Sequence, residues 1–351
     1  MKQILVLTLA FLCALPVFSA RKKAVVASTI KMPPAEILYN EGVALLGKGQ
    51  NDEAIFKFTA SLAEDSTFVQ SYYNRAIAYM NENQLANSVS DLQTAIRLNG
   101  KCSECYLLLG KINYRQGNVE QATQDFASAI ELDPNNINAR LDKSAIFQHA
   151  EDYASAINEY TEILNIDPNN NIALLERANC YQYLNKSNLA HDDYSALIQR
   201  DPSQWQAKFN LTVMDWQLQA DTAACLQALG ELIAAQPNEA VLYNTRGLVL
   251  TQIGEYDSAL VDLNQAIKLD TEYAAAYCNR GVVYLKQKNL EEALLNLNWA
   301  ISFNTNYADA YLNRAIVKEL LRDEDGCCKD LEKAARLGAR NADLYYSRQC
   351  Q

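Results

Sequence analysis

Residues 103–136 read SECYLLLGKINYRQGNVEQATQDFASAIELDPNN, which is one helical pattern, a glycine and a second helical pattern. In the first pattern, Tyr106, Leu109 and Gly110 recur at the i, i+3, i+4 spacing of a single helix face. Gly117 follows, at the point where the chain needs a left-handed residue in order to turn back. The stretch therefore predicts a helix, a tight turn and another helix.

The second helix of this stretch carries small residues on either side of an aromatic one. Ala122 and Ala129 allow two helices to approach closely, and Phe126 fills the space between them. Asp133-Pro134 ends the helix, because proline lacks a backbone N–H and disfavours helical geometry in the residue before it. These two helices are predicted to pack against each other as one hairpin.

The same arrangement returns along the chain with a fixed period. Three sets of equivalent positions are each spaced by 34 residues: Asp133, Asp167 and Asp201, each followed by proline; Tyr243, Tyr277 and Tyr311; and Ala266, Ala300 and Ala334. A fixed period of this length predicts an array of helix–turn–helix repeats, in which each helix pair buries its apolar face against its neighbours.

This pattern resembles the tetratricopeptide repeat, in which a small residue of the first helix precedes an Ala-aromatic-Ala pattern and a closing proline in the second. The resemblance implies an all-α, right-handed superhelical solenoid. We expect nine repeats, at 35–68, 69–102, 103–136, 137–170, 171–204, 205–239, 240–273, 274–307 and 308–341. Repeat 6 departs most from the pattern, because it is one residue longer and has Thr212 at the small position.

The first 19 residues have the three parts of a secretory signal peptide. Lys2 supplies the positive charge, residues 4–15 are apolar, and Val17 and Ser19 provide a small-residue cleavage site. We therefore expect residues 1–19 to be removed by cleavage near Ser19, and the mature protein to be exported to the periplasm or secreted. The apolar stretch is shorter than the roughly 20 residues of a transmembrane helix, so no transmembrane anchor is expected.

Two further segments flank the repeats. Residues 20–34 contain the basic run Arg21-Lys22-Lys23 and the proline pair Pro33-Pro34, and we interpret them as a flexible leader. Residues 342–351 end in polar side chains and are predicted to form a C-terminal capping segment, since the terminal repeat of a solenoid needs a polar outer face.

In the family that the chain resembles, the first helix of each repeat lines a concave groove. Carried over by spacing, the groove positions are Tyr39, Tyr73, Ile77, Met80, Lys111, Tyr114, Arg115, Asn179, Gln182, Tyr183, Phe209, Trp216 and Asn244. Amide, aliphatic and aromatic groups of this kind suit a protein or peptide partner. The alternative for any one of them is packing against a neighbouring helix.

An arginine recurs at one position of the first helix. The set is Arg75, Arg177, Arg246, Arg280 and Arg314. We expect each to form a structural ion pair with an acidic residue of an adjacent helix. Recognition of phosphate or carboxylate on a ligand is the alternative.

Cys102 and Cys105 form a CxxC motif at the start of a predicted first helix. In an oxidising compartment the pair is predicted to be a structural disulfide. A redox role is the alternative, because a helix N-terminus lowers the pKa of a thiol. A zinc site would need a second pair of ligands, and none has the required spacing.

The remaining cysteines suggest one further disulfide. Cys328 and Cys350 would meet if the capping segment folded back on the last repeat. Cys225 and Cys327 occupy the small-residue position of second helices, so we expect them to be buried thiols.

Charge and motif content exclude several classes of function. The formal net charge of -11 does not favour nucleic acid, and the sequence has no nucleophile motif, phosphate-binding loop or metalloprotease motif. We therefore expect no catalytic residues, no metal and no cofactor. The favoured interpretation is a non-enzymatic scaffold that binds a peptide or protein segment outside the cytoplasm. Two alternatives stay open, a redox-responsive envelope protein and an accessory subunit of a cell-envelope enzyme or secretion complex, as does the oligomeric state.

Overall fold

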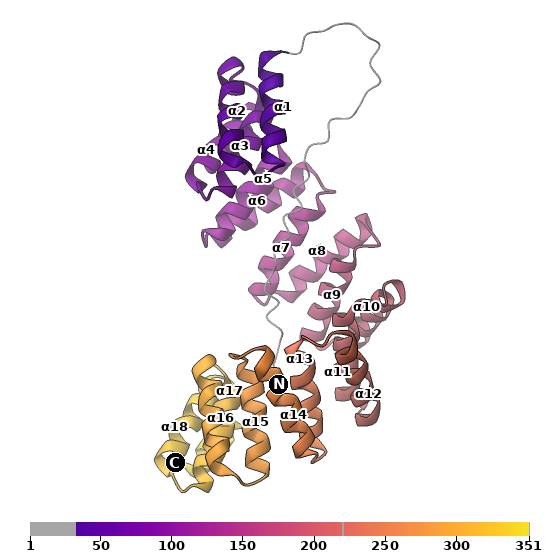
Figure 1. The fold of residues 1–351 in the computed structure, drawn as a ribbon, viewed down its shortest axis with the longest axis vertical. Coiled ribbons are helices and arrows are strands. Elements are labelled where there is room, and N and C mark those ends of the chain that lie inside the picture. Colours follow the sequence, from indigo (N-terminus) through magenta and orange to yellow (C-terminus); the bar gives the residue numbers. More distant parts are fainter. Residues whose placement is uncertain (1–32, 220, 351) are drawn as a thin grey trace. The chain divides into compact units, whose positions relative to one another are not determined.

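A computed structural model describes residues 33–219 and 221–350 (Figure 1). The predicted signal peptide, and all but the last two residues of the predicted leader, lie outside the described residues. The described chain forms two compact bodies. The N-terminal body ends at Leu197, and the C-terminal body begins at Ile198.

Nineteen helices and no strands occur in the described residues, which confirms the predicted all-α repeat fold. The N-terminal body contains α1 (Pro34–Leu46), α2 (Asn51–Glu64), α3 (Val69–Asn81), α4 (Leu85–Leu98), α5 (Ser103–Arg115), α6 (Val119–Leu132), α7 (Ile137–His149), α8 (Tyr153–Ile166), α9 (Asn171–Tyr183) and most of α10 (Ser187–Arg200). The C-terminal body contains α11 (Trp205–Gln219), α12 (Thr222–Ala235), α13 (Ala240–Gln252), α14 (Tyr256–Leu269), α15 (Ala274–Lys286), α16 (Leu290–Phe303), α17 (Ala308–Leu320), α18 (Glu324–Arg336) and α19 (Ala342–Gln349).

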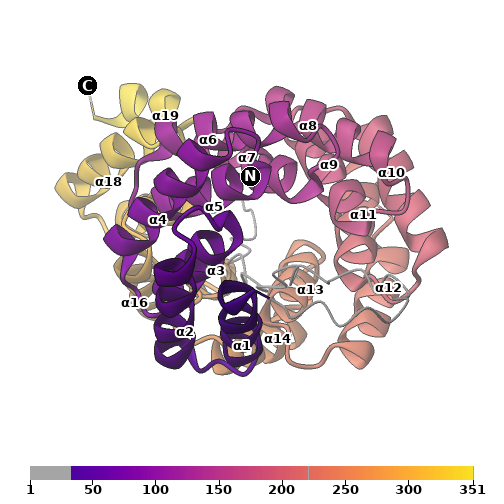
Figure 2. The same cartoon turned by 90° about the horizontal axis from the view of Figure 1, so that it is seen from above.

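The odd-numbered helices from α1 to α17 are the first helices of the predicted repeats, and the even-numbered ones are the second helices. Within the N-terminal body the first helices lie toward the inner side of the curve and the second helices toward the outer side (Figure 2). Neighbouring first helices also contact one another directly: α1 contacts α3, and α5 contacts α7. No helix within 33–219 and 221–350 is long and apolar enough to cross a bilayer.

In every repeat except repeat 6, where the structure does not describe the whole turn, the turn between the two helices contains one left-handed residue. Gly117 has a φ of 82°, as its position in the sequence predicted. Equivalent positions 34 residues apart hold Asn83 and Glu151 with φ of 59° and 57°. Since a left-handed conformation costs a non-glycine residue about 1–2 kcal/mol, the packing of the helix pair must compensate for this cost in most repeats.

The junctions between repeats are Asx turns. After α6, the Asp133 carboxylate accepts a hydrogen bond from the backbone N–H of Asn135 at 3.0 Å, and after α8 Asp167 accepts one from Asn169 at 3.0 Å. Such local bonds give the chain an alternative to continuing the helix. The junction after α4 uses Asn99 instead, which accepts from the backbone N–H of Lys101 at 3.1 Å.

Each helix pair meets at a small residue. A Cβ atom added to Gly110 of α5 would lie 2.6 Å from the Phe126 ring of α6, and one added to Gly281 would lie 2.9 Å from Leu297. Both large partners are at most 1% exposed. The small residue and its large partner are 16 residues apart in each case, so the sequence period and the helix contact have the same origin.

A polar pair with the same 16-residue separation joins the two helices beside this contact. Arg75 donates to both carboxylate oxygens of Asp91, each at 2.7 Å, and Arg177, Arg246 and Arg314 make the same paired bonds to Asp193, Asp262 and Asp330. The predicted structural ion pair is therefore confirmed for these four arginines. Repeat 4 uses Lys143 and Glu159, and repeat 1 reverses the charges with Glu41 and Lys57.

The prediction of an acidic partner is wrong for Arg280. Its Nε donates to the amide oxygen of Asn296 at 2.6 Å, so this repeat has a hydrogen bond in place of an ion pair. Repeats 3 and 6 have no cation at this position, because Leu109 and Leu211 occupy it. In repeat 3 the buried carboxylate of Asp125 instead accepts from Asn113 at 2.7 Å and from Gln121 at 3.1 Å.

Replacing Gly110 by Ala should destabilise α5 and α6 by up to about 2 kcal/mol. Displacing the buried Phe126 ring costs about 1–3 kcal/mol, and the better helix propensity of Ala returns about 1 kcal/mol. Hydrogen exchange of the α5 and α6 amides measures this locally. Gly100→Ala is the matched control, because an added Cβ there meets nothing within 4 Å; equal exchange in the two variants would refute the close-packing argument.

Replacing Arg246 by Met should cost more than replacing Arg280 by Met. The first change leaves the Asp262 carboxylate, which is 4% exposed, without a partner, and losses of about 3 kcal/mol follow from such an unpaired buried charge. The second leaves the neutral Asn296, whose own amide donates to the Glu292 carbonyl, so we expect about 1 kcal/mol. Urea unfolding midpoints with hydrogen exchange of α13–α16 provide the comparison. A larger loss for Arg280→Met would contradict the ion-pair argument.

Alkaline pH should destabilise the N-terminal body through Tyr73. Burial raises the pKa of Tyr73 to about 12, and the nearby Glu104 carboxylate adds to the effect. The neutral phenol thus contributes fully below pH 10, the ordinary tyrosine pKa, and this contribution is lost as the pH rises to 12. Two pKa units correspond to about 2–3 kcal/mol. Tyr73→Phe should therefore lose less stability than wild type between pH 10 and 12 in urea titrations; parallel losses would rule this out.

Candidate functional site

Five of the side chains predicted to line the groove are buried in the core, which corrects the prediction for them. They are Tyr73, Ile77, Phe209, Trp216 and Asn244, each at most 8% exposed. Tyr73 and Ile77 share a core cluster with Cys105, and Phe209 and Trp216 share another with Leu229. The reason is that large side chains on first helices fill the space between adjacent repeats; Tyr73 in addition lines the pocket described below.

Two predicted groove residues of the N-terminal body contact the next first helix. The Tyr39 hydroxyl accepts a hydrogen bond from the Asn74 amide at 3.2 Å. The Lys111 ammonium lies 3.3 Å from the Asp142 carboxylate. Burial raises the pKa of Asp142, and the Lys111 charge opposes this rise. Both contacts connect successive repeats, so these residues have a structural role.

Three further predicted residues belong to a network around α9. The Tyr194 hydroxyl donates to Asn179 at 2.6 Å and lies 3.2 Å from the amide oxygen of Gln182. The Tyr183 ring stacks on Tyr153 with centroids 4.3 Å apart. This network joins α9 to its neighbours on both sides. The remaining predicted residues are the half-buried Met80 and Tyr114 and the exposed Arg115.

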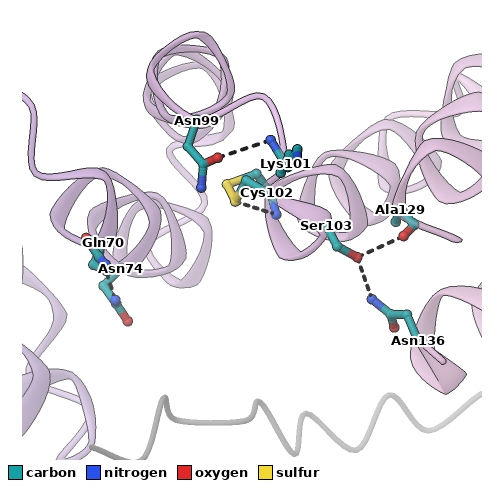
Figure 3. The surroundings of a disulfide bond; sticks show 9 residues. Gln70, Asn74, Asn99, Lys101, Cys102, Ser103, Ala129 and Asn136 are labelled. Atoms are coloured by element: carbon teal, nitrogen blue, oxygen red, sulfur yellow. Dashed lines mark hydrogen bonds between the residues drawn. A yellow bond between two sulfur atoms is a disulfide. The ribbon is translucent and has the colours of Figure 1, made fainter. Parts of the chain in front are cut away.

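A pocket of about 220 Å³ lies between the first turns of α3 and α5. It is lined by Thr67, Val69, Gln70, Tyr73, Asn74, Asn99, Lys101, Cys102 and Glu104. In Figure 3, Gln70 and Asn74 lie on one helix, and Cys102, with Asn99 and Lys101 beside it, lies across from them. The pocket is therefore formed by two neighbouring first helices together with the turns that precede them.

The polar groups of this pocket have both signs of charge and several amides. Gln70, Asn99 and Lys101 are exposed, and Asn74 and Glu104 are half-buried. An amide can donate and accept hydrogen bonds at once, which matches the alternating groups of a peptide backbone. The apolar part of the wall comes from Tyr73, whose raised pKa keeps its hydroxyl neutral beside Glu104.

The second wall of the pocket is anchored to the second helix of its own repeat and to the residue that precedes α7. Ser103, at the start of α5, donates to the Ala129 carbonyl at 2.8 Å and accepts from the Asn136 amide at 3.1 Å (Figure 3). Cys102 is the N-cap of α5, and its sulfur accepts from the backbone N–H of Cys105 at 3.2 Å. The first turn of α5 is thus fixed from both ends.

Sequence reasoning missed the turn residues of this pocket. Thr67, Asn99 and Lys101 precede first helices and lie outside the helix-face positions from which the groove was predicted. The sequence offered only a weak signal, since Asn99-Gly100 stands where the next three junctions have Asp-Pro, and other junctions lack Asp-Pro as well.

Both cysteine pairs proposed from the sequence are joined as disulfides in the structure. Cys102–Cys105 spans three residues within the N-cap and first turn of α5. Cys328–Cys350 spans 22 residues and links α18 to the end of α19. Cys225 and Cys327 are buried free thiols, as predicted, and burial raises the pKa of the Cys225 thiol to about 11.

Models of known repeats match three segments of the chain. A TPR repeat model matches residues 247–288, and tetratricopeptide repeat models match residues 73–137 and 274–307. The segment 73–137 includes α5 and all but the first four residues of α3. The matches therefore cover parts of both bodies.

Two characterised relatives align with this chain over about a hundred residues. The small glutamine-rich tetratricopeptide repeat-containing protein of Dictyostelium discoideum is 32% identical over 102 residues, which are 29% of this chain and 30% of the relative. RNA polymerase II-associated protein 3 of Homo sapiens is 30% identical over 105 residues, 30% of this chain and 16% of the relative. The matched part is thus less than a third of either relative.

Solved structures share the fold at low sequence identity. A tetratricopeptide repeat protein from Parabacteroides merdae ATCC 43184 aligns with a TM-score of 0.58 and 21% identity, over 72% of this chain and 97% of that one. A chain of the APC/C hetero-tetramer Cut9–Hcn1 aligns with a TM-score of 0.58 and 15% identity, over 90% of this chain and 76% of that one. The repeat models identify tetratricopeptide repeats in the matched segments, and the solved structures show that the chain shares the tetratricopeptide-repeat fold, in agreement with the helix pairs at a 34-residue period.

Proposed function

We propose that this chain is a non-enzymatic scaffold that binds an extended segment of a partner protein, and that the pocket between α3 and α5 holds part of that segment. Tetratricopeptide-repeat proteins bind proteins or peptides, and their fold generally serves as a non-catalytic scaffold. The observation that carries the proposal is the set of polar groups that two adjacent first helices and their preceding turns direct to one solvent-open pocket.

The size of the pocket favours a peptide over a cofactor. Sites that enclose a small molecule occupy roughly 300–1,000 Å³, whereas this pocket has about 220 Å³. That volume accommodates a single side chain of a peptide. Amides of Gln70 and Asn74 then lie close enough to bond the peptide backbone, and Lys101 and Glu104 select the charge of its flanking residues.

The proposal includes a location outside the cytoplasm. The charge, apolar stretch and cleavage pattern of residues 1–19 support it, as do two disulfides, which persist in oxidising compartments. N-terminal sequencing of the protein purified from its native source should begin at Ala20. Recovery of a chain that begins at Met1 from the cytoplasmic fraction would refute the location without affecting the pocket.

Peptide binding can be tested with a variant of the pocket that spares the core. Gln70→Ala, Lys101→Glu and Glu104→Ala together remove its polar groups, and none of the three is buried. Random displayed peptides are selected on the wild-type protein, and binding of the selected peptides is measured by fluorescence anisotropy. The triple variant should bind at least tenfold more weakly, because about 1.4 kcal/mol, the sum of two or three hydrogen bonds, corresponds to tenfold.

A matched variant controls for the change in net charge and for the substitution of exposed side chains. Gln93→Ala, Arg97→Glu and Glu120→Ala make the same types of change at exposed positions of α4 and α6, outside the pocket. This control should bind like wild type. Selected peptides that bind the pocket variant as tightly as the control would move recognition to another surface.

A further inference from the structure

The two disulfides of the chain have different structural consequences. Cys328–Cys350 closes a segment of 22 residues and attaches the short helix α19 to α18. It therefore substantially reduces the conformational entropy of the unfolded chain. Cys102–Cys105 closes three residues of a single helix start. Chain-entropy stabilisation is smaller for a shorter loop, and Ser103 already anchors this turn, so Cys102–Cys105 contributes little to holding the fold.

The sulfurs of the Cys102–Cys105 pair are unequal in access. Cys102 lines the pocket and is 8% exposed, whereas Cys105 is fully buried in the core cluster of Tyr73 and Leu108. A thiol that enters the pocket therefore meets the Cys102 sulfur, and Cys105 lies behind it. This order assigns Cys102 as the attacked sulfur and Cys105 as the leaving group.

The helix start stabilises the Cys102 thiolate that the second step of such an exchange releases. The Cys105 backbone N–H already points at the Cys102 sulfur, at 3.2 Å, and the positive end of the helix dipole lies there. Lys101 adds a positive charge next to it, and Glu104 a negative one. A thiolate released at Cys102 would thus be hydrogen-bonded at once, which is the environment of a reactive cysteine.

We propose that Cys102–Cys105 is a redox-active pair that undergoes thiol–disulfide exchange with a dithiol segment of the protein bound in the pocket. The inference rests on the pocket of the proposed function and gives it a substrate class, a partner with two cysteine thiols. Gln70 and Asn74 face the disulfide across the pocket, so a bound backbone would lie beside the Cys102 sulfur (Figure 3).

The exchange balances without any further reagent. A partner thiolate attacks the Cys102 sulfur, the Cys102–Cys105 bond breaks, and Cys105 leaves as a thiolate that takes up a proton. The second partner thiol, after losing its proton, attacks the partner sulfur of the mixed disulfide and releases Cys102 as a thiolate. The partner is oxidised by two electrons to a disulfide, and the cysteine pair is reduced by two electrons.

Single-cysteine variants test the assignment independently of peptide binding. Cys105→Ala leaves the Cys102 thiol at the pocket, and Cys102→Ala leaves the buried Cys105. With glutathione disulfide as the probe, mass spectrometry should show a mixed disulfide at Cys102 that forms at least tenfold faster than one at Cys105. Equal rates, or an unreactive Cys102, would overturn the inference, and circular dichroism verifies that both variants fold.

A redox titration of the wild-type protein covers the case in which a variant fails to fold. In glutathione buffers of increasing reducing strength, alkylation and mass spectrometry should find Cys102 and Cys105 reduced before Cys328 and Cys350, because the longer loop favours its disulfide. Reduction of both pairs together, or in the reverse order, would contradict the proposal. A peptide that binds the pocket while Cys102 stays inert would leave the scaffold function intact and remove only the redox step.

Discussion

The two helices of each repeat are joined by a contact between residues 16 positions apart, and the other features of the structure depend on it. A small residue receives the large side chain of the partner helix, as Gly110 receives Phe126. In most repeats a polar pair lies beside this contact and joins the two helices, as Arg75 of α3 and Asp91 of α4 do at 2.7 Å. The apolar contact supplies the burial, and the polar pair specifies one register between the helices, because a partly buried carboxylate is costly when its partner is displaced.

The arginines also connect one repeat to the repeat before it. Arg75 reaches back to Thr59 and Arg314 to Asn298, each 16 residues earlier on the preceding second helix. Arg246 has no such side chain within reach, because the equivalent residue is Gly230. One side chain thus bonds two second helices in most of these repeats, which is how nearest-neighbour contacts stabilise a repeat array.

Repeat 3, which has no cation at this position, is also the repeat that carries the pocket wall. Leu109 replaces the arginine, and amides rather than a cation satisfy Asp125. The start of its first helix is instead fixed by Ser103 and by the disulfide. The departures from the repeat pattern and the candidate site therefore coincide, as expected if local rules are relaxed where a site requires it.

The sequence by itself determined the helix pairs, their period and the residues that pack between them, because a helix face and a left-handed turn are encoded by neighbours in the chain. It also indicated the arginine pairs, although not that Arg280 would meet the neutral Asn296. Only the tertiary structure decided which first-helix residues face solvent. Tyr73 and Trp216 occupy groove positions by spacing, yet the adjacent repeat covers them. The pocket depends on the junction turns at Thr67 and Lys101 meeting the helices α3 and α5, and these two turn residues do not recur with the period of the repeat.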